Sequence, residues 1–324
     1  MPGICRLRVR RIQHVHGETS VTFDRRRFLG GTLALGAGAC IPPDQSPIGR
    51  LQAKLRIVEA AADGTLGAEI LDTRTGISVG INRDRRFGHC SSFKLSLAAM
   101  VLARDAAGEL DADRRVTWSE DDLMFVSPFT TRRLAEGATL KELAEFTQKY
   151  SDNAAANILL RELGGPQSLT DFWRSIGDNV SRLDRIEPAL NNVPVTEVRD
   201  TTTPAAMART VSRLVYGGVL PDAQKSLLRQ WMIDTPTGAR RVRAGLPEGW
   251  IAGDKTGTSI WPGMGSLYVD IGFVEPEDHA PIAFATYFRA QDTHSGMDPA
   301  SEEALARVGE VIADFVKRDR PFPF

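Results

Sequence analysis

The chain has 324 residues, of which 42% are apolar and 25% are charged, and its 40 Lys and Arg nearly balance its 41 Asp and Glu. These values are ordinary for a globular protein and exclude a disordered chain, a collagen and a coiled coil. The formal net charge of −1 leaves no basic excess to neutralise phosphates, so we expect no nucleic-acid partner.

The first 39 residues have the composition of an export signal. They hold seven Arg and two acids, and Arg25-Arg26-Arg27-Phe28-Leu29 precedes a short Gly- and Ala-rich run that ends at Ala39. A basic start, a short apolar run and a small-residue end are typical of such signals, and the run is too short to span a bilayer. The double arginine followed by Phe-Leu resembles the twin-arginine signal. We predict cleavage to a periplasmic form, with a lipid anchor at Cys40 as the alternative.

Residues 40–324 form the predicted main domain. Apolar spacing predicts a helix over 46–61, and two short runs, 68–71 and 77–81, predict a hairpin. The pattern is then mainly helical up to about residue 230. Three strand-like runs follow, and Asp298 with Pro299 predicts the start of a last helix; the three runs are 250–255, 266–274 and 281–289.

These elements predict an α/β fold. We expect an antiparallel sheet of about five strands built from both chain ends and flanked by helices, with an all-helical subdomain inserted between the two halves. The predicted sheet part covers about 40–88 and 231–324, and the helical part covers about 89–230.

Two short motifs open predicted helices. In Ser91-Ser92-Phe93-Lys94, the serine and the lysine are three residues apart and so share one face of a helix. A serine there gains positive backbone potential, and a buried lysine beside it can act as a base. Ser151-Asp152-Asn153 precedes a second helical run, and an ordinary N-cap explains this tripeptide equally well.

Two further motifs lie later in the chain. A long loop contains Glu187-Pro188-Ala189-Leu190-Asn191, and Arg185 and Asp200 are placed to fasten its neck; a loop of this length is usually functional. Lys255-Thr256-Gly257-Thr258 lies on a predicted strand, where the glycine would let a ligand backbone approach closely.

Together the four motifs resemble the class A serine β-lactamases, because the S-x-x-K, S-D-N and K-T-G elements occur in the family order with the Glu-Pro loop before the third. The resemblance implies that Ser91 is the acylating nucleophile and that Lys94, or Glu187 through a water, activates it. Ser151 would relay a proton to the lactam nitrogen. Glu187 and Asn191 would hold the water that hydrolyses the acyl-enzyme.

The resemblance also implies how a β-lactam substrate would bind. Asn153 would hold its acylamide group, Lys255 and Thr256 would bind its carboxylate, and the backbone N–H groups of Ser91 and Thr258 would form the oxyanion hole. Many family members also bind the carboxylate with an arginine on the next strand, where this chain has none. Arg241 matches the alternative position used by other members, so the resemblance assigns this carboxylate contact to Arg241.

One side of the expected pocket departs from the family pattern. Val126 stands where the family often has an aromatic wall residue, and we expect it to widen the mouth of the site. The nearby aromatics Phe125 and Trp118 are expected to pack in the core.

The residues directly before Ser91 and at position 259 bear on substrate range and on alternative bases. Ser259 occupies the position where carbapenem-hydrolysing relatives often carry a cysteine partner, so Cys90 is expected to be a free, buried thiol. His89 has no evident Asp or Asn partner, and a packed or surface role is expected. The sequence predicts no cofactor, no metal site and a monomer. A D-alanyl-D-alanine peptidase and a non-catalytic penicillin-capturing protein remain the alternative functions.

Overall fold

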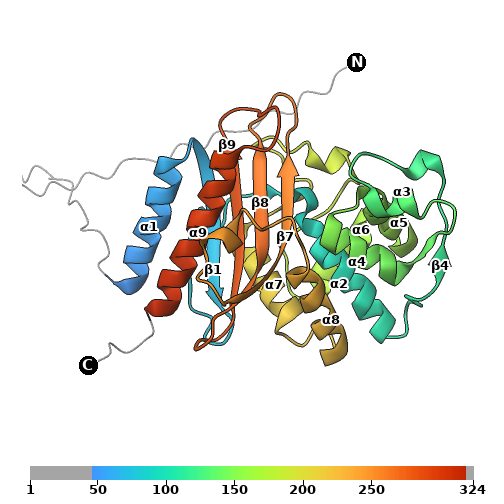
Figure 1. Ribbon diagram of the computed structural model, residues 1–324, viewed down its shortest axis with the longest axis horizontal. Helices are drawn as coiled ribbons and strands as arrows, with labels where there is room; N and C mark the ends of the chain where they lie inside the picture. Colours follow the sequence, from blue (N-terminus) through green and yellow to red (C-terminus); the bar gives the residue numbers. More distant parts are fainter. Residues whose placement is uncertain (1–45, 319–324) are drawn as a thin grey trace, which may run out of the picture. The chain divides into compact units, whose positions relative to one another are not determined.

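The computed structural model describes residues 46–318, so the predicted export signal and Cys40 lie outside the described residues. A five-stranded antiparallel sheet lies at the centre of this part, in the strand order β2-β1-β9-β8-β7 (Figure 1). The predicted sheet, built from both chain ends, is therefore confirmed. Its strands are β1 (Gly64–Asp72), β2 (Ser78–Ile81), β7 (Ile251–Ser259), β8 (Leu267–Glu275) and β9 (Ile282–Ala290).

The first and last helices cover one face of the sheet, where they pack against each other (Figure 1). Helix α1 (Pro47–Ala61) is capped by Ser46, whose hydroxyl accepts the N–H of Gly49 at 3.0 Å. Helix α9 (Pro299–Lys317) is capped by Asp298, whose carboxylate accepts the N–H of Ser301 at 2.8 Å. Both predicted helices are confirmed, and the predicted N-cap of α9 is the observed one.

Each face of the sheet is covered by its own hydrophobic core. On β8 and β9, Tyr268, Phe284 and Phe288 pack with α1 and α9, whereas Ile271 and Phe273 point to the other face. Successive side chains of a strand point to opposite faces, so a strand buried on both sides is apolar throughout. The continuous apolar runs of β8 and β9 are explained by this two-sided burial.

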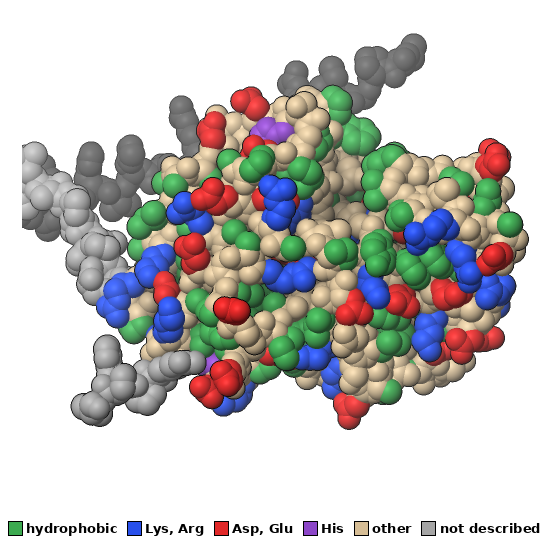
Figure 2. All heavy atoms as spheres, in the orientation of Figure 1, with side chains coloured by type: hydrophobic (Ala, Val, Ile, Leu, Met, Phe, Trp, Pro, Cys, Tyr) green, Lys and Arg blue, Asp and Glu red, His purple; other side chains and the backbone are tan. Residues whose placement is uncertain are grey.

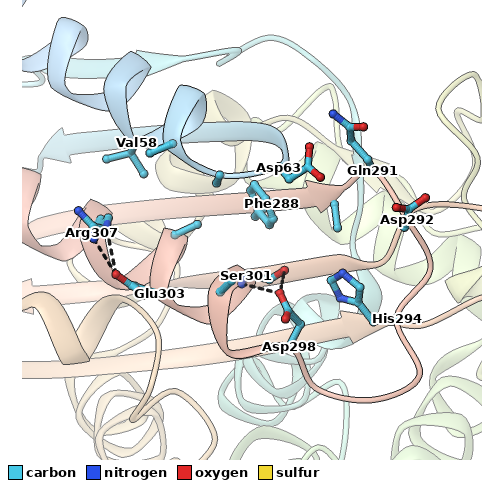
Figure 3. A pocket seen from close by; sticks show the side chains of 15 residues that line it. Val58, Asp63, Phe288, Gln291, Asp292, His294, Asp298, Ser301, Glu303 and Arg307 are labelled. Atoms are coloured by element: carbon cyan, nitrogen blue, oxygen red, sulfur yellow. Dashed lines mark hydrogen bonds and ion pairs between the residues drawn. The ribbon is translucent and has the colours of Figure 1, made fainter.

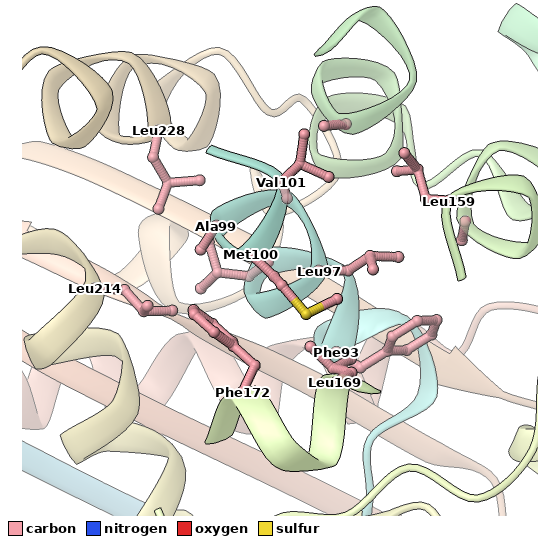
Figure 4. Packing of buried hydrophobic residues seen from close by; sticks show 14 of the residues in the cluster. Phe93, Leu97, Ala99, Met100, Val101, Leu159, Leu169, Phe172, Leu214 and Leu228 are labelled. Atoms are coloured by element: carbon pink, nitrogen blue, oxygen red, sulfur yellow. The ribbon is translucent and has the colours of Figure 1, made fainter. Parts of the chain in front are cut away.

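Helix α2 (Phe93–Ala106) is the centre of the second core. All ten of its residues from Phe93 to Leu102 are buried, as expected for a helix that is surrounded by others. In Figure 4, Leu97 and Met100 of α2 point among apolar side chains of the surrounding helices. The other helices that contribute buried side chains to this core are α3 (Pro128–Arg132), α4 (Leu140–Tyr150), α5 (Asn153–Leu163), α6 (Pro166–Ser175), α7 (Pro204–Val215) and α8 (Asp222–Ile233).

Among the described residues, two pairs of short strands lie outside the large sheet. Strand β3 (Phe87–Gly88) pairs with β6 (Thr201–Thr202), and β4 (Arg115–Val116) pairs with β5 (Ala138–Thr139). Helix α7 lies inside the predicted helical range and α8 ends just beyond it, at Ile233, yet both pack against the strands of the large sheet. The helical region and the sheet thus share one core, and the domain boundaries given above stay a prediction.

The surface carries charges of both signs. On the face shown in Figure 2, Lys and Arg side chains are interspersed with Asp and Glu over the described residues. Within residues 46–318, the structure contains no helix long and apolar enough to cross a membrane.

A single buried carboxylate joins two helices of the helical region. Asp152, which is fully buried, caps α5 by accepting the N–H of Ala155 at 2.8 Å. It also accepts the N–H groups of Phe129 and Thr130 at 2.9 and 3.1 Å, and the Thr130 hydroxyl at 3.0 Å. Asp152 therefore holds the start of α3 against the start of α5.

We predict that Asp152→Ala lowers the free energy of unfolding by about 3 kcal/mol or more, because it removes a cap and leaves buried N–H groups without acceptors. Urea unfolding measures the loss. The control is Asp234→Ala at the surface, where one ion pair to Lys149 is lost and the cost should stay below about 1 kcal/mol. Equal losses in the two variants would contradict the role given to Asp152.

Candidate active site

Ser91 lies one turn before a buried lysine. It belongs to a short 3₁₀ helix, Cys90–Ser92, that leads directly into α2. Lys94 is fully buried in the first turn of α2, and its Nζ donates to the Ser91 Oγ at 2.9 Å. The spacing in the sequence therefore produces the predicted contact.

The Lys94 ammonium group also contacts three other residues. Its Nζ lies 3.0 Å from the Ser151 carbonyl, 2.5 Å from the Asn153 Oδ1 and 3.1 Å from the Glu187 Oε1. Burial lowers the pKa of Lys94 below its ordinary value, and the Glu187 carboxylate opposes this shift. A lysine with a lowered pKa is better able to accept a proton from a neighbouring hydroxyl.

The Ser151 hydroxyl lies between two buried amines. Ser151 ends α4 in the left-handed conformation, with φ of 60°. The Lys255 Nζ donates to its Oγ at 3.1 Å, and the Lys94 Nζ lies 3.4 Å away. Burial lowers the pKa of Lys255 well below its ordinary value, and the nearby charge of Lys94 adds to this effect. The arrangement suits proton transfer through Ser151.

Glu187 faces Ser91 from the long loop. Its Oε1 accepts the Ser91 hydroxyl at 3.4 Å, and its Oε2 accepts the Asn191 Nδ2 at 2.6 Å. The side chain of Asn157 on α5 holds the backbone of Glu187 from both sides, donating to its carbonyl at 2.9 Å and accepting its N–H at 3.0 Å. Asn157 was not predicted from the sequence, although it lies one helical turn after Asn153 and so shares its face of α5.

The neck of the loop has the predicted fastening. The Arg185 Nε lies 2.5 Å from the buried carboxylate of Asp200. The same carboxylate accepts the backbone N–H groups of Asp184 and Arg185 at 2.7 and 2.9 Å. The ends of the loop are thus joined by both an ion pair and backbone hydrogen bonds.

Strand β7 forms another wall of the site. A side chain at Gly257 would lie 2.9 Å from the Ser91 backbone nitrogen, so the glycine lets β7 approach the segment that carries Ser91. Gly257 also lines the pocket, so its predicted role in letting a ligand backbone approach stays a prediction. The buried Arg241 lies behind this strand, and its guanidinium donates to the Gly257 carbonyl at 2.9 Å and to the Thr258 Oγ1 at 2.7 Å. Arg241 thus reaches the site through Thr258.

One pocket of about 170 Å³ brings these segments together. Its lining residues are Ser91, Phe125, Val126, Ser151, Asn153, Glu187, Asn191, Thr256, Gly257 and Thr258. Lys94, Lys255 and Arg241 contact this lining from behind.

The residues before Ser127 form the open edge of the pocket. Phe125 is 63% exposed, so its expected core role is wrong, whereas Trp118 is buried as predicted. Asn153 binds the carbonyls of both Phe125 and Val126, at 3.0 and 2.9 Å, and Val126 has a φ of 54°. These bonds fix the turn that carries the exposed side chains of Phe125 and Val126.

The two residues before Ser91 are buried and do not line the pocket. Cys90 is a free, buried thiol, as predicted, and burial raises its pKa to about 12. Of the two roles expected for His89, packed or surface, the structure shows the packed one. His89 is fully buried, its ring centroid lies 4.9 Å from that of Trp173, and burial lowers its pKa to about 4.

A larger cavity of about 480 Å³ lies between α1 and α9, remote from these residues (Figure 3). Val58 and Phe288 contribute apolar surface to it, and His294 and Asp298 contribute polar surface. None of the predicted site residues lines it. No group of three His, Cys, Asp or Glu within residues 46–318 is arranged to hold a metal ion.

A serine with a buried lysine and a carboxylate beside it in one pocket is the arrangement of catalytic groups expected in a serine hydrolase. The model of the β-lactamase enzyme family matches residues 50–316. The β-lactamase OXY-2 of Klebsiella oxytoca is 38% identical over 262 residues, which cover 81% of this chain and 88% of that protein. The β-lactamase SME-1 of Serratia marcescens is also 38% identical, over 78% of this chain and 86% of its own length.

Solved structures agree with these sequence matches. The class A β-lactamase of the last common ancestor of Gram-negative bacteria is 44% identical with a TM-score of 0.76, and the match covers 81% of this chain and 98% of that one. A β-lactamase from Desulfarculus baarsii is 38% identical with a TM-score of 0.78, covering 83% and 97%. The chain therefore belongs to the β-lactamase enzyme family, and within it to the class A serine β-lactamases.

Proposed function

We propose that the protein hydrolyses the amide bond of penicillin- and cephalosporin-type antibiotics through an acyl-enzyme on Ser91, and so confers resistance. The relatives named as β-lactamases support this substrate class. The observation that carries the proposal is that the Ser91 Oγ lies within 3.4 Å of both the Lys94 Nζ and the Glu187 Oε1 in one pocket.

In the acylation step, the Ser91 Oγ attacks the lactam carbonyl and loses its proton. The proton passes either directly to Lys94 or through a water to Glu187, and the two contacts of Ser91 suit both routes. The backbone N–H groups of Ser91 and Thr258 would stabilise the oxyanion. Strand β7 is an edge strand of the sheet, which leaves its outer row of N–H groups free to serve this purpose.

The lactam nitrogen must gain a proton as its bond to the carbonyl carbon breaks. Ser151 would supply that proton, because its hydroxyl lies within 3.4 Å of two buried amines. Lys94 and Lys255 would in turn restore the proton to Ser151. Lys255 and Thr256 also bind the substrate carboxylate in this proposal, and Asn153 holds the acylamide group.

Glu187 decides between hydrolysis and stable capture of the antibiotic. With Asn191 it would bind a water and take one of its protons as the water attacks the acyl ester. A penicillin-capturing protein or a peptidase of the same superfamily would lack this pair. A chromogenic cephalosporin separates the candidates: sustained turnover supports a β-lactamase, and a single stoichiometric burst supports capture. Release of D-alanine from a cell-wall peptide would instead support the peptidase.

We predict that Glu187→Ala leaves a long-lived covalent adduct after a β-lactam is added, because the water loses its base. Intact-protein mass spectrometry detects the adduct, and stopped-flow kinetics measures its decay. Glu197→Ala is a matched control, since Glu197 lies on the same loop but pairs with Arg199 outside the pocket. Rapid turnover by Glu187→Ala would contradict the proposed role.

We predict that Arg241→Ala raises KM for carboxylate-bearing β-lactams about tenfold or more. The change removes the guanidinium that holds the Thr258 hydroxyl at the site, and a charge-assisted bond of this kind is worth roughly 1.5–3 kcal/mol. Steady-state kinetics with benzylpenicillin measures the change. Arg240→Ala is the control, since Arg240 is largely exposed and lies beside Glu302. Unchanged kinetics in Arg241→Ala would refute the assignment.

We also propose that the protein is exported by the twin-arginine route and acts as a monomer in the periplasm. The order Arg25-Arg26-Arg27-Phe28-Leu29 followed by a short small-residue run supports this route. Cleavage after Ala39 and lipid attachment at Cys40 are distinguished by the mass of the N-terminal peptide from fractionated cells.

A further inference from the structure

Three consecutive carbonyl groups of the long loop are each bound by a different element. The Asn191 carbonyl accepts the Ser259 Oγ at 2.8 Å, from the end of β7. The Asn192 carbonyl accepts the Arg185 Nη2 at 2.9 Å, from the neck of the loop. The Val193 carbonyl accepts the Arg289 Nη2 at 2.9 Å, from β9. The backbone of 191–193 is thereby held at every residue.

Arg289 is a buried cation whose partners are backbone carbonyl groups. It is 8% exposed, and its second donor contact is to the Gly265 carbonyl at 3.3 Å, between β7 and β8. Among the described residues no carboxylate lies within ion-pair distance of its guanidinium, and burial lowers its pKa below the ordinary value. Burying a cation against neutral carbonyls lowers the stability of the fold. Destabilising features of this kind typically occur at functional sites.

The held segment also packs against the strand that leads to Ser91. Val193 is buried, and its Cβ would lie 3.1 Å from a side chain placed at Gly88. Gly88 is three residues before Ser91. The segment 191–193 is therefore fixed relative to the nucleophile as well as to the sheet.

We propose that Arg289 and Ser259 are positioning residues for the release of the acyl-enzyme. By holding the backbone of 191–193, they direct the Asn191 amide to the Glu187 Oε2, and so keep the base and its water aligned. In this step the water oxygen bonds to the acyl carbon and gives a proton to Glu187, and the bond to the Ser91 Oγ breaks as a proton returns to it. The inference rests on the proposed function, because it concerns the hydrolytic step of that reaction.

Acylation by the direct route, in which Lys94 takes the Ser91 proton, should depend much less on these two residues. The contacts of the Ser91 Oγ and the Ser151 Oγ with Lys94 come from α2, outside the held segment. Arg289 does not line the pocket, so its replacement leaves the surface that meets the substrate intact.

The test compares Arg289→Met and Ser259→Ala with the wild type, using benzylpenicillin. We expect kcat and KM to fall together by about tenfold, with kcat/KM changed less than about twofold, because kcat then reports deacylation and kcat/KM reports acylation. Intact-protein mass spectrometry after rapid quenching should show the acyl-enzyme accumulating in both variants. Arg289→Lys, which keeps the charge and a donor, should recover part of kcat, and it replaces Arg289→Met if that variant does not fold.

Arg229→Met is the matched control, since Arg229 is a half-buried guanidinium that binds Glu275 far from the loop. It should lower the melting temperature without accumulating acyl-enzyme. The inference is overturned if the variants at Arg289 and Ser259 behave like this control, or if kcat/KM falls as much as kcat. If the wild type itself shows no turnover of benzylpenicillin, the proposed function fails first, so the two failures are distinguishable.

Discussion

The site depends on one buried ammonium group. Lys94 contacts the Ser91 hydroxyl, the Ser151 backbone, the Asn153 amide and the Glu187 carboxylate, all within 3.1 Å. A fully buried charge is stable only when such partners surround it, so each segment that supplies a partner is held in place by the same atom. The lowered pKa that results from this burial is also what suits the lysine to proton transfer.

The rest of the fold holds these segments around Lys94. Helix α2 is buried on all sides, so the first turn that carries Lys94 cannot shift without disturbing the second core. Asp152 holds the start of α5, and with it Ser151 and Asn153. The loop with Glu187 is held by Asp200 at its neck and by Asn157 at its centre. Rigid elements thus position a group of short, local contacts.

Much of the site could be predicted from the sequence because its parts lie in short motifs. Ser91 and Lys94 are one helical turn apart, and Asp152 is an N-cap residue just after Ser151, so local rules place them. The strands of the sheet and the terminal helices were predicted for the same reason. The order of the motifs along the chain then indicated the family.

The missed contacts join residues that are distant in the sequence. Arg289 meets Val193 across 96 residues, and Ser259 meets Asn191 across 68, so no local pattern marks either pair. Phe125 was misassigned because an aromatic side chain usually indicates burial, whereas here a turn held by Asn153 directs it outward. The partners of a residue in a loop are decided by tertiary structure, which composition does not reveal.

The pairing of β1 with β9 has a consequence for how the molecule assembles. Gly64 lies opposite Ala290, so β1 has no neighbour on that side until the chain has been synthesised as far as β9. Closing so long a stretch of chain is entropically costly and slow. The large sheet therefore lacks one of its central pairings until Ile282–Ala290 becomes available, and the earlier strands must stay partly unpaired up to that point.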